Sequence, residues 1–211
     1  MMEKNRCGVL PKDGAQPWKM PKKAADMGVD MIVLTGNPGV GVDNRAITKA
    51  LADLNEAVGD RVILTAGKMH ASGILSEAGE KILTKEDAET FIEAGADVLL
   101  LPAPGTVPGF TMEHAAELIK TAHEKGVLAM TTIGTSQEGA DEETIRQIAL
   151  MCKMAGADIH HIGDSGYMGM ELPENITAYS VQSWKKAYLP QNGDVTCKMK
   201  DRMDDFRQKE M

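Results

Sequence analysis

Two glycine-rich loops also carry hydroxyl side chains, and this combination could bind an anion. The first loop reads IGTSQEG over 133–139, and the second reads IGDSGYMG over 162–169. Glycines let backbone N–H groups approach an anion, and hydroxyls add donors. The predicted phosphate- or carboxylate-binding residues are Gly134, Thr135, Ser136, Gly163, Ser165 and Gly166. Ordinary tight turns are the alternative. Glu138 and Asp164 would repel a bare anion unless a cation intervenes.

Lys68 and His70 follow an apolar segment over 62–66. A lysine there could form a Schiff base with a carbonyl substrate if its amine is neutral, or it could hold a substrate anion or a neighbouring carboxylate. His70 could act as an acid or base, because imidazole titrates near neutral pH, or it could cap the loop.

His160 and His161 are adjacent in the last apolar segment. Neighbouring residues of a strand point to opposite faces, so one ring should face the helix layer and the other the inner side of a barrel. His161 is nearer the strand end and is the better site candidate. With Asp164 and His70 it could hold a divalent metal, although no metal site and no other cofactor is assigned. Lys68, His70, His161 and Asp164 are the candidate catalytic residues.

Asn37 lies in a Gly-Asn-Pro-Gly segment over 36–39, where it could hydrogen-bond a substrate or simply form a turn. Other nucleophile and phosphate motifs are absent from the sequence. No D-x-D follows an apolar segment, and neither a G-x-S-x-G elbow nor a G-x-x-x-x-G-K-[ST] loop occurs. These residues therefore give no support to a hydrolase.

Five junctions of helix, glycine and apolar strand must position these residues. The glycines recur every 30 to 36 residues, at Gly28, Gly59, Gly95, Gly126 and Gly156. That period is typical of a βα unit, and a glycine suits a helix end that needs a left-handed residue. The pattern predicts parallel strands near 31–35, 61–66, 97–101, 127–132 and 158–162. Because such strands place functional loops at their carboxyl ends, the loops above should share one rim.

Five such units fit either a partial (β/α)8 TIM barrel or a flavodoxin-like doubly wound sheet. The first strand lacks a following G-x-G-x-x-G, and polar glycine-rich loops follow every strand rather than one switch point. Both features favour the partial barrel, with its strands in sequential order. We expect a polar N-terminal segment over 1–19, the five-unit partial barrel over 20–182 and a polar C-terminal appendage over 183–211.

The composition restricts the class of protein. The chain has 211 residues, a net charge of −8 and no long basic run, so a nucleic-acid surface is not expected. No apolar run is long enough to cross a membrane, and no leader-like segment begins the sequence. Its three cysteines form no C-x-x-C pair, and Cys152 fits the buried face of a helix. We expect a cytoplasmic protein.

Five segments taken in order resemble a bacterial family of TIM-barrel proteins of unknown function. They are VLTGNPGVGVDN (33–44), ILTAGKMHASG (63–73), LLPAPGTVPGFT (100–111), TIGTSQEGAD (132–141) and HHIGDSGYMG (160–169). Members carry the names haloacid dehalogenase-like hydrolase or phosphoenolpyruvate phosphonomutase-like protein. The resemblance covers about 20–182 and implies that this chain matches the last five βα units of the family barrel.

We therefore expect a lyase, aldolase or isomerase acting on a small anionic, phosphorylated metabolite. The alternatives are a non-catalytic metabolite-binding or regulatory barrel, and an inactive barrel fragment. A five-unit sheet also leaves both edge strands unpaired. We expect self-association, or a partner chain that supplies the missing βα units.

Overall fold

A computed structural model describes residues 19–36, 42–69, 79–134, 137, 139–163 and 171–183. Strands and helices alternate along the chain. The strands are β1 (Met31–Thr35), β2 (Ile63–Gly67), β3 (Val98–Pro102), β4 (Leu128–Ile133) and β5 (Ile159–Ile162). The helices are α1 (Lys19–Asp26), α2 (Asn44–Val58), the short 3₁₀ helix η3 (Gly79–Ile82), α3 (Lys85–Glu93), α4 (Met112–Glu124), α5 (Glu142–Ala155) and α6 (Pro173–Ser183).

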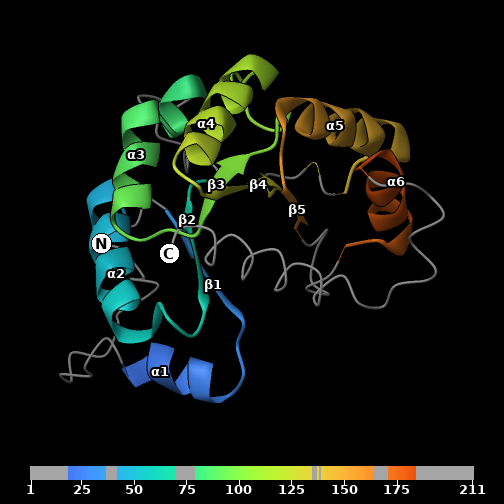
Figure 1. Ribbon diagram of the computed structural model, residues 1–211. Helices are drawn as coiled ribbons and strands as arrows, with labels where there is room; N and C mark the ends of the chain where they lie inside the picture. The colour runs from blue at the N-terminus through green and yellow to red at the C-terminus, as the bar shows by residue number, and fades with distance from the viewer. Residues whose placement is uncertain are drawn as a thin grey trace, which may run out of the picture.

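The five strands form one parallel sheet in the order β1-β2-β3-β4-β5. The helices α2 to α6 follow one another around its outer side, and this gives an α/β half-barrel (Figure 1). Sequential order confirms the partial-barrel prediction. The flavodoxin-like alternative is wrong, because a doubly wound sheet would place one strand out of sequence.

Polar side chains cap the first turns of α2, α3, α4 and α5. The side chains of Asp43, Thr111 and Asp141 each accept a backbone N–H in the first turn, and Thr84 forms a reciprocal capping box with Asp87. Each cap satisfies a backbone donor that the helix cannot pair internally. Each of these helices therefore begins at a defined residue.

Glycine ends most of these helices in the predicted way. Gly28, Gly95, Gly126 and Gly156 have positive φ angles between 74° and 105°. Gly59 differs, because its φ is −62° and it remains right-handed. A Cβ atom on Gly59 would lie 2.2 Å from the Asn55 Oδ1, so close packing, and not a left-handed backbone, favours glycine there.

The main hydrophobic core lies between the sheet and the helices. Outward strand residues such as Leu64, Leu99 and Ala129 pack against the apolar faces of α2 to α4, and Ile47 and Leu118 are among their partners. A smaller apolar group covers the inner face, where Val98, Leu100, Met130 and Ile159 meet. The sheet thus separates a helix-facing core from an inner surface. Within the described residues, no helix is long and apolar enough to cross a membrane.

Candidate active site

One inward-facing row lies at the carboxyl end of the sheet. Pro102 pairs with Thr132, and Thr132 pairs with His161. Gly67 pairs with Leu100. Met69 and Pro102 each lie two residues further along the chain, so their side chains belong to the same face of the sheet. The row therefore consists of Met69, Pro102, Thr132 and His161, which come from four consecutive units.

Thr132 contacts both Met69 and His161 in this row. Its Oγ1 lies 3.0 Å from the Nδ1 of His161 and 3.3 Å from the Sδ of Met69. The hydroxyl carries one proton, so it donates either to sulfur or to an unprotonated Nδ1, or it accepts from a protonated Nδ1. When the hydroxyl donates to an unprotonated Nδ1, or accepts from a protonated one, Thr132 orients an imidazole that is exposed on the inner surface. An oriented, accessible imidazole can exchange a proton with a bound molecule.

Two of the predicted binding glycines border this pair. A Cβ atom on Gly134 would lie 3.2 Å from the Met69 Sδ and 3.4 Å from the Thr132 Oγ1, so glycine keeps the space above the cluster open. The backbone N–H of Gly163 donates to the carbonyl of Ile133 at 2.7 Å and holds the end of β5 against the end of β4. The two loops therefore begin side by side at the Thr132–His161 pair.

Lys68 lies at the same end of the sheet, but its stem leaves on the other face. The side chain is only 2% exposed. A Cβ atom on Gly36 would lie 3.3 Å from the Lys68 Cγ and 2.9 Å from the Ile47 Cδ1, so the stem passes between the end of β1 and α2. Strand alternation explains this placement, because Gly67 faces inward and the next residue faces outward. The structure thus separates the stem of Lys68 from the inner row that contains His161.

His160 packs in the helix layer, as the alternation predicts. Its Nδ1 lies 3.0 Å from the Tyr179 hydroxyl of α6 and 3.4 Å from the Thr131 Oγ1. Burial lowers the pKa of His160 below its ordinary value and raises the pKa of Cys152 and of Tyr179. Because these groups lie behind the sheet, His160 belongs to the core and His161 to the candidate site.

The remaining predicted site residues lie outside the described residues, and their roles stay predictions. They are His70, Asp164, Asn37, Thr135, Ser136, Ser165 and Gly166. In the part of the chain that the structure describes, no group of three or more His, Cys, Asp or Glu side chains could hold a metal ion. The proposed metal set needs His70 and Asp164, so it is not tested by the described residues.

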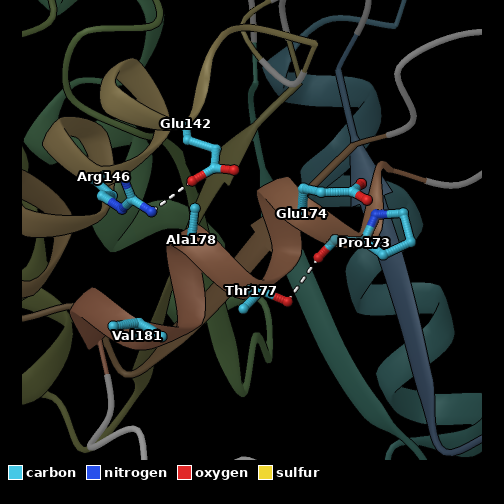
Figure 2. A pocket seen from close by; sticks show the side chains of 7 residues that line it. All are labelled: Glu142, Arg146, Pro173, Glu174, Thr177, Ala178 and Val181. Atoms are coloured by element: carbon cyan, nitrogen blue, oxygen red, sulfur yellow. Dashed lines mark hydrogen bonds and ion pairs between the residues drawn. The ribbon is translucent and has the colours of Figure 1, made fainter.

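A separate groove of about 390 Å³ lies between α5 and α6 on the outer layer (Figure 2). Its polar lining includes Glu142, Arg146, Glu174 and Thr177. Arg146 pairs with Glu142 along α5, and the Thr177 hydroxyl donates to the Pro173 carbonyl. No strand residue lines the groove, so it is distinct from the inner row.

Sequence reasoning missed Met69 and Thr132. Both could have been found by counting every second residue along the predicted strands, from Ile63 through Thr65 and Gly67 to Met69. Thr132 has the same position relative to Met130. Neither is a titratable residue, and for this reason a search for acids, bases and nucleophiles passes over them.

Solved structures with the same arrangement include several aldolases. The structure called QR15, an aldolase, matches with a TM-score of 0.57 at 12% identity over 79% of this chain and 68% of its own. Deoxyribose phosphate aldolase from Aeropyrum pernix matches with a TM-score of 0.56 at 19% identity over 83% and 69%. A phosphonomutase-like protein from Burkholderia cenocepacia J2315 matches with a TM-score of 0.54 at 19% identity over 79% and 71%. These likenesses show a shared fold.

A comparison with curated proteins gave no match. A protein family does match, and it covers residues 9–182, which is most of the chain and includes all five βα units. The chain belongs to this family, which is described as a domain of unknown function, DUF7916.

Proposed function

We propose that this chain binds a small anionic, phosphorylated carbonyl metabolite at the carboxyl ends of β4 and β5, and converts it by lyase, aldolase or isomerase chemistry. The observation that carries the proposal is the Thr132–His161 pair, at 3.0 Å, on the inner surface. An imidazole held by a hydroxyl can move a proton at a carbon next to a carbonyl, a step that these three reaction classes share. The adjacent loops, which start at Gly134 and Gly163, would bind the anion through backbone N–H groups.

The fold supports this placement. In (β/α)8 barrels the active site lies at the carboxyl ends of the strands, and phosphate often binds at the last two loops. The aldolases above share the arrangement of strands, and one of them is named for a phosphorylated sugar substrate. We further propose that the five units correspond to the last five of a complete barrel, so that the loops after β4 and β5 are its final two.

The role of Lys68 is a separate part of the proposal. Its stem is buried beside Gly36 and Ile47. We propose that it acts as an electrostatic or structural contact at the rim and not as a Schiff-base nucleophile. Borohydride added with a carbonyl substrate under turnover should leave Lys68 unmodified. A covalent adduct on Lys68, located by peptide mass spectrometry, would reverse this assignment.

A panel of small phosphorylated aldehydes and ketones tests the activity, with substrate loss followed by NMR. For a compound that is converted, His161→Gln should lower kcat/KM by about 10²–10⁴-fold, because it removes the proton-transfer group. Thr132→Val keeps the shape but loses the hydrogen bond, and it should have a smaller effect of about tenfold. His123→Gln is the control, because His123 pairs with Asp158 near the end of α4, far along the strands from the site.

A non-catalytic metabolite-binding protein is the rival, and one observation favours it. His161 is the single titratable side chain in the inner row of described residues. Binding of a phosphorylated compound, seen as a rise in the melting temperature, with no conversion at any enzyme concentration would support the rival. Equal turnover by the wild type and by His161→Gln would refute the catalytic role of His161.

A further inference from the structure

Each end of the half-barrel has an edge strand, β1 at one end and β5 at the other. Among the described strands, β1 and β5 each pair on one side only. Each therefore presents a row of backbone N–H and C=O groups that parallel pairing could satisfy. Most inner residues of the three central strands are buried, and Ile63 and Leu128 at their amino ends are partly buried, whereas Val33 and Thr35 of β1 and His161 of β5 are exposed. Exposure of the inner surface is thus concentrated at its two ends.

Large apolar side chains gather near the β1 end. Met20 of α1 is 80% exposed and Met27 is 76% exposed, and both Val29 and Val33 are exposed as well. These four residues come from one stretch of 14 positions, 20–33. Such a group of exposed apolar side chains next to an unpaired strand is typical of an interaction surface.

The other end carries its own apolar residues on the segment that follows β5. Leu172 is 51% exposed and Ile176 of α6 is 40% exposed. The charges of the two ends are opposite. The exposed Lys22 and Lys23 belong to α1, while the exposed Glu174 stands in the first turn of α6. In the same stretch the exposed Asp26 pairs with Arg61 and the exposed Asp30 adds one negative charge, so Lys22 and Lys23 leave the β1 end with a small positive balance.

We propose that two copies of this chain pair end to end, with the β1 end of each copy against the β5–α6 end of the other. A two-fold axis along the strands would make both junctions identical and would keep all strands parallel. Apolar side chains would then meet apolar ones, Lys22 and Lys23 would face Glu174 of the partner subunit, and each unpaired strand would gain a neighbour. The proposed pairing rests on the edge strands and the exposed side chains of the two ends, and it does not depend on the proposed activity.

The pairing would place the site beside a junction. His161 lies on β5, so the β1 strand of the partner subunit would lie along the strand that carries the exposed imidazole. Fewer water molecules would then reach the Thr132–His161 pair. A less hydrated site strengthens the electrostatic interactions within it.

Light scattering coupled to gel filtration tests the pairing. The wild type should have twice the 22.7 kDa mass of one chain and should dissociate on dilution. Val33→Asp should raise the dissociation constant at least about tenfold, since it buries an unpaired carboxylate in the junction. Leu150→Asp is the matched control, because Leu150 has the same 47% exposure as Val33 but lies on α5. Circular dichroism confirms that each variant is folded.

Charge exchange distinguishes this junction from any other contact. The double variant Lys22→Glu/Lys23→Glu should weaken the dimer, and adding Glu174→Lys to the same chain should restore it, because both junctions regain opposite charges. A wild-type monomer at all concentrations would overturn the proposal, as would a dimer that Val33→Asp and Leu150→Asp weaken equally. A monomer that turns over substrate would refute only the pairing, and an inactive dimer only the activity.

Discussion

At the scale of single residues, His160 and His161 are neighbours with opposite surroundings. Burial against Tyr179 lowers the pKa of His160 below its ordinary value of 6.5. The unfolded chain then binds more protons than the folded chain as the pH falls below about 6.5, so the free energy of unfolding should decrease there. Urea unfolding between pH 8 and pH 5 measures this slope.

Two variants isolate the contribution of His160. His160→Phe can keep a ring beside Tyr179 but cannot be protonated, so its unfolding midpoint should depend less on pH than that of the wild type. Tyr179→Phe, which removes the hydroxyl beside the imidazole but keeps the buried histidine, should retain a pH-dependent midpoint. The same slope in wild type and His160→Phe would contradict the assignment of His160 to the buried cluster.

The structure explains why position 67 is a glycine. A Cβ atom there would lie 1.8 Å from the carbonyl oxygen of Leu100, which is backbone and cannot turn away. We expect Gly67→Ala to reduce the free energy of unfolding by more than about 2 kcal/mol. Gly28→Ala is the comparison, since Gly28 has open space around it and a φ of 88°, and left-handed backbone alone costs about 1–2 kcal/mol. Similar losses in both variants would exclude the steric explanation.

At the scale of elements, two aspartate side chains at strand starts accept hydrogen bonds from the backbone of the preceding strand. The Asp97 Oδ2 accepts the backbone N–H of Leu64 at 2.9 Å, and the Asp158 Oδ2 accepts that of Ala129 at 2.9 Å. Both aspartates occur in a Gly-Ala-Asp segment just before a strand, at 95–97 and 156–158. The side chain thus adds a hydrogen bond where strand pairing begins.

These side-chain hydrogen bonds predict that Asp97→Ala lowers the free energy of unfolding more than Asp30→Ala does. Asp97→Ala should cost about 1.5–3 kcal/mol, because the Leu64 N–H loses a charged acceptor. Asp30→Ala should change stability by less than about 0.5 kcal/mol, since Asp30 is exposed and joins β2 through its backbone oxygen. Urea midpoints of the two variants make the comparison. A larger loss for Asp30→Ala would show that the side-chain bonds are unimportant.

The elements were predictable from the sequence to a greater extent than the site. Glycine spacing and capping residues such as Thr84 are local, and they predict strands within about two residues of those observed. The opposite directions of His160 and His161 follow from alternation alone. The same alternation places the stem of Lys68 on the outer face, because Lys68 lies between Gly67 and Met69. The partnership of His160 with Tyr179 depends on how α6 packs, which no local pattern encodes.

At the scale of the whole molecule, the two open ends predict a concentration-dependent stability. If folded chains pair and unfolded chains do not, raising the protein concentration must raise the melting temperature. Val33→Asp should melt at a temperature that is lower and nearly independent of concentration, whereas Leu150→Asp should follow the wild type. Differential scanning calorimetry over a dilution series measures both. A wild-type melting temperature that does not change with concentration would argue against pairing.

The sequential order of the strands has a consequence for how the chain reaches this structure. Each strand pairs only with the strands of adjacent units, and the main helix contacts join consecutive helices. Strand pairing therefore joins residues about one unit apart, such as Met31 and Ile63, so each pairing closes a loop of about one unit and not of several. Structure can start at any pair of units and spread to the next, as in a linear repeat protein. A sheet assembled in this way can gain or lose whole units at its ends without changing the contacts among the units that remain.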